Sequence, residues 1–461
     1  MKQIETISPI DGKVYVTRPK ATDVDVMAKL ELAKTAQQSW RSTDLAERQS
    51  ICRKMVAFFV DNEQEIAEQI SWQMGRPIRY AAGEVKGFAE RANHMISIAD
   101  AALADIQLSD QPGFHRYIKR EALGLVLVIA PWNYPYLTAV NVIVPAILAG
   151  NGVLLKASAQ TPLCAEQIAT AFDKAGLPDG VFQYLHLDHS QTESLISHPA
   201  LNHIAFTGSV SGGVMVERAV AGQFKSVGLE LGGKDPAYVR FDADLEHAVE
   251  TVIDGAFFNS GQSCCGVERV YVHEAVYDTF VEHAVALVNQ YQLGRADDPN
   301  TTLGPMVNSS AADFVRRQID DALSQGARAH IDEADFPASQ PGSPYLAPQL
   351  LTDVNHAMRV MTEESFGPVL GVQKVSSDEE AIALMNDSEF GLTASVFSQD
   401  QMAAISIGEQ LETGTFFVNR CDYLDPALAW TGVKKSGKGC TLSQIGYEAL
   451  TRPKSFHLKQ L

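Results

Sequence analysis

The chain has 461 residues, of which 46% are hydrophobic and 20% are charged. That composition is typical of a soluble globular protein with two or three domains of about 150 residues each, and it excludes a disordered, collagen-like or disulfide-stapled chain. The 37 basic residues against 56 acidic residues give a formal net charge of −19, which argues against a broad surface for nucleic acid or for an anionic membrane.

The sequence shows no membrane anchor and no oxidising-compartment pattern. The longest apolar run, at 123–130, is too short to span a bilayer, which takes about 20 residues. The first residues, MKQIETISPIDGK, contain no apolar signal segment. Six cysteines are scattered without CxxC spacing, at Cys52, Cys164, Cys264, Cys265, Cys421 and Cys440. We therefore expect a cytoplasmic protein with reduced thiols, no bound metal ion, and no membrane or nucleic-acid partner.

The N-terminal region is predicted to be helical. Apolar residues recur at helical spacing at Val26, Leu30, Ala33 and Trp40. A second helix is predicted from about Asp44 to Met74, because Gly75 and then Pro77 form a common helix exit.

From about residue 123, strand-like and helix-like segments alternate. Strands are predicted at 125–130, 152–156, 181–185, 203–208 and 226–231. Helix-length stretches lie between them, such as 161–175, which Gly176 and Pro178 follow. This alternation predicts βαβ units and a mostly parallel sheet, and the continuous apolar runs indicate that both sheet faces are covered.

A second α/β stretch follows, with strands predicted at 236–239, 268–273, 369–375 and 393–398. Two α/β lobes in one chain indicate a cleft between them. The segments 112–122 and 452–461 alternate like strands, and we expect these two arms to pair, for example with another subunit.

Four polar clusters follow predicted strands, where open α/β sheets bind ligands. They are APWNYP (130–135), KASAQTP (156–162), FTGSVSGG (206–213) and LELGG (229–233), the last followed by GQSCC (261–265). The Gly/Ser turn of the third cluster suits a phosphate, because glycines permit close approach and a following helix N-terminus favours an anion. A plain turn is the alternative, since GxGxxG is absent. Lys156 suits ribose or phosphate, or is a surface lysine.

Three residues have side chains that suit carbonyl chemistry. Cys264 follows a Gly-bearing bend and is a candidate nucleophile, with a buried structural cysteine as the alternative. Glu230 is a candidate general base or a solvated carboxylate. Asn133 is a candidate donor to an oxyanion or a turn-forming residue. No single one of them decides the function.

Together, the motifs resemble the NAD(P)-dependent aldehyde dehydrogenase superfamily over essentially the whole chain. They match in order as PWNYP, LLKASAQTP, FTGSVSGG, LELGGKDP, FFNSGQSCC, EESFGPV, GLTASVFS and KKSGKG. The resemblance implies an aldehyde dehydrogenase-like α/β fold with two Rossmann-like parallel-sheet domains and a small β oligomerisation arm. It implies a cofactor-binding domain of 1–102 and 123–232, a catalytic domain of 233–446, and a bridging domain of 103–122 and 447–461. A homodimer or homotetramer is the implied assembly.

The resemblance also implies the reaction, which is the oxidation of an aldehyde to a carboxylic acid with NAD or NADP. Cys264, with Cys265 beside it, would form a thiohemiacetal and then a thioester. Asn133 and the backbone N–H of Cys264 would form the oxyanion hole. Glu230 would activate the water that hydrolyses the thioester.

For the cofactor, the resemblance assigns Lys156 to the adenosine ribose, and Glu364 to the nicotinamide ribose. The same cleft would also include Trp132, Gly208, Ser209 and Phe366. NAD-selective relatives often carry Glu three residues after the lysine, where it repels a 2′-phosphate. Here Ala159 takes that place, and Ser158 or Lys156 could bond a phosphate, so both nucleotides stay open.

A Lys and a Glu that often interact behind the general base are replaced by Val142 and Thr441. The proton route around Glu230 is therefore expected to use other groups or water.

By alignment, the substrate tunnel would be lined by Tyr134, Leu137, Thr138, Asn141, Phe258, Ser263, Cys421 and Trp430. Thr138 and Asn141 are polar where enzymes for fatty or aromatic aldehydes carry large apolar residues. No arginine pair marks a succinic semialdehyde pocket, although Arg420 is nearby. We therefore expect a short or medium-length aldehyde that is neutral or polar, hydroxylated and amino-bearing ones included.

Three alternatives remain at this point. A CoA-acylating variant would require CoA for turnover, but that branch tends to lack the glutamate that Glu230 supplies. A non-catalytic protein on the same fold would need none of Cys264, Glu230 and Asn133. A thiol hydrolase would need a histidine partner, and no local histidine motif is visible.

Overall fold

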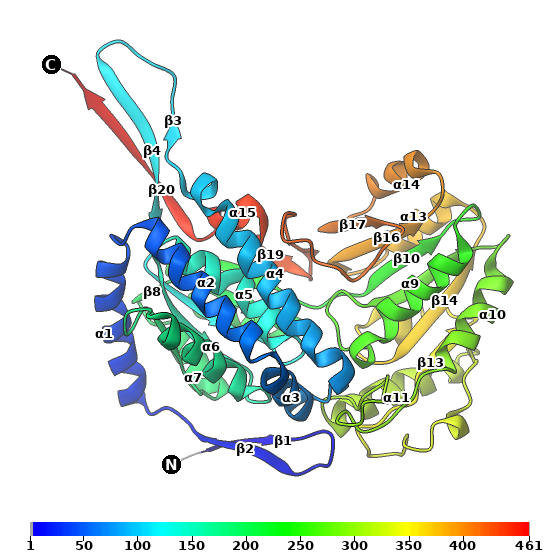
Figure 1. The fold of residues 1–461 in the computed structure, drawn as a ribbon. Coiled ribbons are helices and arrows are strands. Elements are labelled where there is room, and N and C mark those ends of the chain that lie inside the picture. Colours follow the sequence, from blue (N-terminus) through cyan, green and yellow to red (C-terminus); the bar gives the residue numbers. More distant parts are fainter. Residues whose placement is uncertain (1–2, 461) are drawn as a thin grey trace.

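The computed structural model describes residues 3–460, which form two α/β lobes and a projecting β arm (Figure 1). The first lobe contains a six-stranded sheet in the order β19-β9-β8-β5-β6-β7. Its strands are β5(Leu125–Ile129), β6(Gly152–Lys156), β7(Phe182–Tyr184), β8(Leu201–Thr207), β9(Ser226–Glu230) and β19(Gly437–Lys438). All pairs are parallel except β19 with β9. The five strands predicted between 125 and 231 are confirmed within two residues.

Two helical layers cover this sheet, which explains its continuous apolar runs. Val126 and Val128 of β5 face one core, and Leu125, Leu127 and Ile129 face the other. The helices on the first side are α2(Leu45–Asp61), α3(Glu63–Met74), α4(Ile78–Leu103), α5(Pro135–Leu148) and α6(Pro162–Ala175). Those on the second are α1(Asp23–Trp40), α7(His189–Ile196) and α8(Val210–Val220).

The single helix predicted from Asp44 to Met74 is wrong, because the structure has two helices that separate at Asn62. The side-chain amide of Asn62 donates to the backbone oxygen of Phe58 at 2.7 Å, and such local bonds compete with helical ones. The predicted exit is confirmed, since Gly75 closes α3 in a left-handed conformation, with φ 87°.

The second lobe contains a seven-stranded sheet in the order β12-β13-β14-β11-β10-β16-β17. The strands are β10(Asp235–Val239), β11(Val267–His273), β12(Arg328–Ala329), β13(Gln349–Thr352), β14(Val369–Val375), β16(Thr393–Phe397) and β17(Thr415–Val418). All pairs are parallel except β12 with β13. The four strands predicted here are confirmed within a residue.

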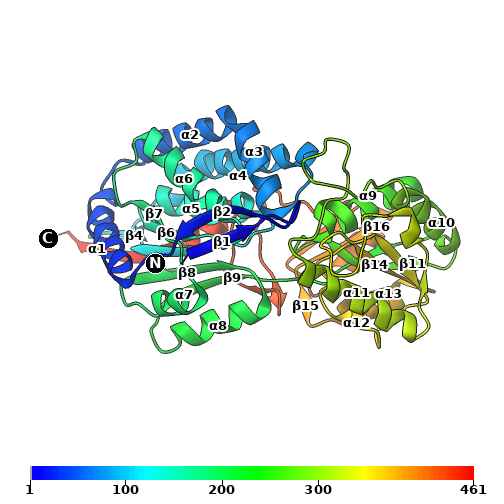
Figure 2. The ribbon, with the colours of Figure 1, turned by 90° about the horizontal axis from the view of Figure 1, so that it is seen from below.

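Helices cover both faces of this second sheet as well. One core includes α9(Leu245–Phe257) and α10(Tyr277–Val288), and the other includes α11(Ser309–Ser324), α12(Arg359–Thr362), α13(Asp378–Asn386) and α14(Gln401–Gly408). The remaining elements are β1(Gln3–Ile7), β2(Val14–Pro19), η1(Phe258–Gly261), η2(Glu333–Asp335), β15(Phe390–Gly391), β18(Val433–Lys434) and α15(Ser443–Glu448). Figure 2 shows the two lobes side by side from below.

The two predicted arms pair with each other. β4(Phe114–Ala122) and β20(Thr451–Lys459) run antiparallel over their full length, and β3(Ile106–Gln107) pairs with the other edge of β4. Tyr117 stacks on Phe456 across this ladder, with ring centroids 4.6 Å apart. The arm projects from the first lobe (Figure 1). Its use in an oligomer and the domain limits stay predictions.

The chain passes from the first sheet to the second at 231–234, directly between β9 and β10. Parallel strands end at a common sheet edge, so the polar clusters after β5, β8 and β9 gather at this crossing. Within residues 3–460, no helix is both long and apolar enough to cross a membrane.

Candidate active site

Two cavities meet where the lobes join, and they share Thr138, Glu230 and Cys264. The α4 cavity, of about 450 Å³, lies between α4, the start of α5 and the loop 419–430. The strand-end cavity, of about 420 Å³, lies at the ends of β5, β8 and β9 and against residues 364–366. A thiol and a carboxyl group therefore lie between two separate small-molecule sites.

A strained turn presents Cys264. Asn259, Ser260 and Gly261 are all left-handed, with φ of 54°, 58° and 71°. A Cβ on Gly261 would lie 2.2 Å from the backbone oxygen of Gly367, so only glycine fits there. Left-handed non-glycine residues store strain that the surrounding structure must hold. The result is that Cys264 is partly exposed and borders both cavities.

Cys265 is the less reachable of the two neighbouring thiols. It is buried, and its Sγ donates to Oδ1 of Asp422 at 2.9 Å. Its hydrogen bond with Cys264 and its burial raise its pKa well above that of an ordinary thiol. Because a thiolate is the reactive form, Cys264 is the better placed nucleophile.

Glu230 ends β9 and is held by two hydroxyl groups. Thr441 Oγ1 donates to its Oε1 at 2.6 Å, and Thr207 Oγ1 donates to its Oε2 at 3.0 Å. Burial raises the pKa of Glu230, while the two hydroxyl bonds act in the opposite direction because they favour the charged form. Thr441 and Val142, at the positions of the missing Lys/Glu pair, line a smaller cavity on which Glu230 also borders.

Asn133 lies in the strand-end cavity beside Cys264. It is 5% exposed, and its Nδ2 donates to the backbone oxygen of Gln262 at 3.2 Å. An amide nitrogen has two protons, so this bond orients the group and leaves a second donor. Asn133 and Cys264 are thus brought together as predicted from the sequence.

A buried ion pair that the sequence analysis missed supports Asn133. Arg76 donates to Glu84 and to the backbone oxygen of Asn133, and its guanidinium lies 4.4 Å from the ring centre of Tyr134. Glu84 in turn accepts the backbone N–H of Tyr136 at 2.8 Å, in the first turn of α5. A carboxylate there satisfies free N–H groups and suits the positive end of the helix.

The strand-end cavity contains five of the residues predicted for the cofactor, which are Trp132, Gly208, Ser209, Glu364 and Phe366. Ser209 caps α8 and accepts the N–H of Gly212 at 3.2 Å, so an eleven-residue helix begins at the cavity wall. The rings of Trp132 and Phe366 pack edge to face, with their centroids 5.7 Å apart.

Glu364 projects its carboxyl group into this cavity. Its Oε1 accepts the N–H of Gly233 at 3.0 Å, and burial raises its pKa to about 7. The neighbouring backbone is fixed by Glu268, which accepts the N–H groups of Ser365 and Phe366 and pairs with buried Lys234 at 2.6 Å. The sequence analysis named neither Lys234 nor Glu268.

Lys156, Ser158 and Ala159 lie outside the lining of that cavity, at the end of β6. Because β6 lies next to β5 in the sheet, they belong to the same strand-end edge. Lys156 is 9% exposed, and burial lowers the pKa of its ammonium group. Ala159 is exposed, and its backbone oxygen accepts from Thr6 Oγ1 at 2.9 Å.

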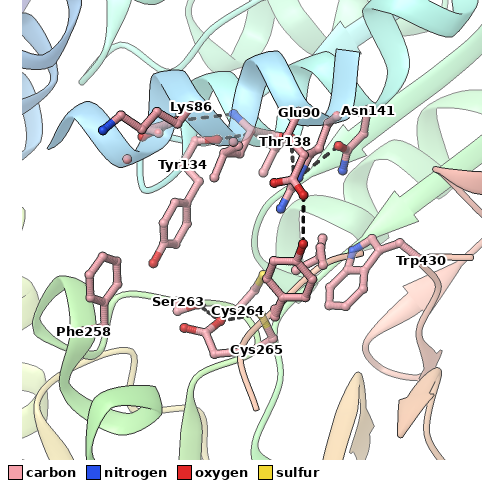
Figure 3. Close-up of a pocket in the computed structure, with 18 of the residues that line it drawn as sticks. Lys86, Glu90, Tyr134, Thr138, Asn141, Phe258, Ser263, Cys264, Cys265 and Trp430 are labelled. Carbon is pink, nitrogen blue, oxygen red and sulfur yellow. Dashed lines mark hydrogen bonds between the residues drawn. The ribbon is translucent and has the colours of Figure 1, made fainter. Parts of the chain in front are cut away.

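Seven of the residues predicted for the substrate line the α4 cavity, namely Tyr134, Leu137, Thr138, Asn141, Phe258, Ser263 and Trp430. Figure 3 shows Thr138 and Asn141 on the wall opposite Ser263 and Cys264. Cys421 is not brought to this cavity. Its thiol lies in the core of the second lobe and donates to the backbone oxygen of Thr251 at 3.2 Å.

Charged residues also line the α4 cavity, and of these Arg91 was missed. Arg91 lines it and is 8% exposed, whereas Arg420, the arginine singled out in the sequence, is exposed and stacks on Tyr423 at 3.7 Å. Asp422 accepts from Ser263 Oγ at 3.1 Å and from Cys265, and burial raises its pKa to about 7. These groups carry no motif, since α4 and the loop 419–430 meet only in the folded chain.

The fold and this arrangement define an α/β enzyme with a reachable thiol between two ligand cavities. Comparison with known proteins gives the family. A sequence model described as the aldehyde dehydrogenase family matches residues 1–456. The chain is 34% identical to the succinate semialdehyde dehydrogenase [NAD(P)+] Sad of Escherichia coli, over 96% of this chain and 95% of that protein. It is also 34% identical to the lactaldehyde dehydrogenase of Escherichia coli, over 95% and 91%.

Comparison with solved structures supports the same family. The crystal structure of a succinic semialdehyde dehydrogenase from Streptococcus pyogenes in complex with NADP+ is 29% identical, with a TM-score of 0.94, covering 99% of this chain and 100% of that one. The chain belongs to the aldehyde dehydrogenase family, and it is an enzyme of this class.

Proposed function

We propose that this enzyme oxidises an aldehyde to the carboxylic acid with NAD+ or NADP+, and that it releases the acid by hydrolysis. The observation that carries the proposal is the position of Cys264 and Glu230 at the junction of two cavities. One cavity suits a small aldehyde and the other suits part of a dinucleotide. A thiol and a carboxyl group at the junction can serve both halves of one reaction.

The strand-end cavity fits a dinucleotide by the chemistry of its walls. Glu364 Oε2 accepts no hydrogen bond from residues 3–460, so this oxygen is free for ribose hydroxyl groups. The N-terminus of α8, with Ser209, suits the pyrophosphate because helix N-termini favour anions. Lys156 supplies a cation farther along the edge. Relatives named for NAD(P)+ and NADP+ support either nucleotide for this chain.

In the first half-reaction, the Cys264 thiolate attacks the aldehyde carbon and forms a thiohemiacetal. The oxygen that becomes negative accepts from the amide of Asn133, which Gln262 and Arg76 hold in place. A nicotinamide held in the strand-end cavity beside Glu364 would supply the hydride acceptor, and Cys264 would then carry the acyl group as a thioester.

In the second half-reaction, Glu230 takes a proton from water, which attacks the thioester and frees Cys264. A carboxylate with a raised pKa is a better base, and the two threonine hydroxyls keep it oriented. Such a held base supports hydrolysis over transfer to CoA.

The test is turnover of an aldehyde panel with NAD+ and with NADP+, each with and without CoA, followed as reduced nicotinamide. We expect turnover without CoA. Strict dependence on CoA would refute the hydrolytic proposal, and the ratio of the two nucleotides gives the preference that Ala159 permits.

Variants test the residue roles. Cys264→Ser should nearly abolish turnover and retain nucleotide binding, while Cys265→Ser keeps much of the activity. Glu230→Gln should slow acid release more than the first burst of reduced nicotinamide. Equal losses from the two cysteine variants, or a lost burst in Glu230→Gln, would contradict the assigned roles.

A further inference from the structure

Arg91 is a buried cation that forms no ion pair with a carboxylate of residues 3–460, although the charge of Glu230 acts on it without direct contact. It lies on the buried face of α4, seven residues after Glu84, and it is 8% exposed. Arg76, on the same wall, has its own partner in Glu84. No ion pair with Arg91 forms within residues 3–460. An unpaired buried charge is costly, which is why buried charges in proteins are normally paired.

The hydrogen bonds of Arg91 occupy only one edge of its guanidinium group. Nη1 donates to the backbone oxygen of Leu137 at 2.8 Å and to Oδ1 of Asn141 at 3.3 Å. Nε and Nη2, which form the other edge, donate to no group of the described chain, and neither is a fully enclosed atom. This edge is the fork that binds a carboxylate through two parallel bonds.

Asn141 holds the guanidinium group of Arg91 in place. The residue is 1% exposed, and its Nδ2 has no hydrogen-bond partner within residues 3–460. The bond from Arg91 to Oδ1 fixes which end of the amide carries the protons. Both residues line the α4 cavity that contains Cys264. Because this Nδ2 is fully enclosed, Asn141 acts through its Oδ1, which orients the guanidinium, and a ligand in the cavity meets the open edge of Arg91.

The carboxylates that line the cavity do not serve as a counter-ion for Arg91. Glu230 is already bonded to Thr441 and Thr207, and Asp422 to Ser263 and Cys265. Glu90 and Asp254 also line the cavity, and neither forms an ion pair with Arg91. Arg91 is thus a buried cation in the same cavity as Cys264 that has no ion-pair partner within residues 3–460.

We propose that the substrate is a short oxo acid, an aldehyde with a carboxylate a few carbons from the carbonyl group, and that Arg91, oriented by Asn141, binds this carboxylate through Nε and Nη2. The inference rests on the proposed function, because it places the aldehyde carbon at Cys264. It replaces the expectation of a neutral or polar aldehyde, which relied on the polar side chains of Thr138 and Asn141 in the predicted lining.

The test compares matched substrates that differ only in the carboxylate. These are glyoxylate with acetaldehyde, 4-oxobutanoate with butanal, and 5-oxopentanoate with pentanal. We expect kcat/KM to favour at least one oxo acid by roughly 10- to 100-fold, the range of a hydrogen bond to a charged group. Arg91→Leu should remove that preference through the KM of the oxo acid, with the matched aldehyde unchanged.

Arg79→Leu is the control, because Arg79 is exposed on the same helix and does not line the cavity. It should leave the preference unchanged. If thermal unfolding shows that Arg91→Leu does not fold, Arg91→Lys decides, since lysine keeps the charge and loses the fork. It should raise the KM of the oxo acid several-fold and leave that of the matched aldehyde unchanged.

Three results would overturn the inference and leave the proposed function intact. One is a wild-type enzyme without preference in any matched pair. Another is an equal loss for both members of a pair in the Arg91 variants, which would mean that Arg91 acts through Glu230 or the fold. The third is a preference for 4-hydroxybutanal over 4-oxobutanoate. Failure to oxidise any aldehyde with either nucleotide would instead refute the proposed function itself.

Discussion

Replacing Thr441 with valine should shift the pH dependence of acid release. The Thr441 hydroxyl donates to Glu230 Oε1 at 2.6 Å and therefore favours the charged carboxylate. Valine has the same shape and no hydroxyl. Burial already raises the pKa of Glu230, so the loss of this donor raises it further.

The size of the shift follows from the bond. A hydrogen bond to a charged group contributes about 1.5–3 kcal/mol. Since one pKa unit equals about 1.4 kcal/mol, the pKa of Glu230 should rise by about 1–2 units. A general base works when it is deprotonated, so steady-state kcat falls below its pKa. The acidic limb of kcat should therefore move upward by about 1–2 pH units.

The assay is kcat across pH, together with the burst of reduced nicotinamide, which precedes hydrolysis. The burst should keep its pH dependence, because it reports attack by Cys264. Thr441→Ser keeps the donor and is the matched control. Thr207→Val removes the longer bond of 3.0 Å and should give a smaller shift in the same direction. An acidic limb that stays in place or moves downward in Thr441→Val would refute the reasoning.

Three further predictions concern residues that support the site. Arg76→Met leaves Glu84 buried without its partner, so we expect a loss of about 3–5 kcal/mol in the free energy of unfolding, measured with denaturant, and a loss of turnover; an unfolding midpoint like that of the wild type would contradict this. Glu364→Gln should raise the KM of the nucleotide with little change in the Tm of the free enzyme, and an unchanged KM would remove Glu364 from the nucleotide site. Tyr423→Phe removes the 2.9 Å hydrogen bond from Tyr423 to Glu90, which joins the loop 419–430 to α4. The KM of the aldehyde should therefore rise about 2- to 10-fold at constant kcat. A fall in kcat alone would exclude a role of this bond in holding the cavity wall.

The positions of the strands along the chain were accessible to sequence analysis because they are encoded locally. Short apolar runs such as Leu125–Ile129 and Gly152–Lys156 are covered on both faces, and such runs separated by helix-length stretches predict parallel sheets. Helix ends could be predicted only where a residue that terminates helices marks them, as Gly75 does. The break at Asn62 was missed because an asparagine inside a helical pattern does not by itself end a helix.

The residues of the candidate site also fall into those that the sequence identifies and those that only the folded chain brings together. The sequence by itself determined the family resemblance and selected Cys264, Glu230 and Asn133 as the candidate residues, because each lies in a short motif at a strand end or bend. Only the tertiary structure decided what surrounds them. Arg91 contacts a residue 50 positions away and Thr441 one 211 positions away. Periodicity indicates which face of a helix is buried, but not which charged group that face will meet, because the partner comes from a distant part of the chain.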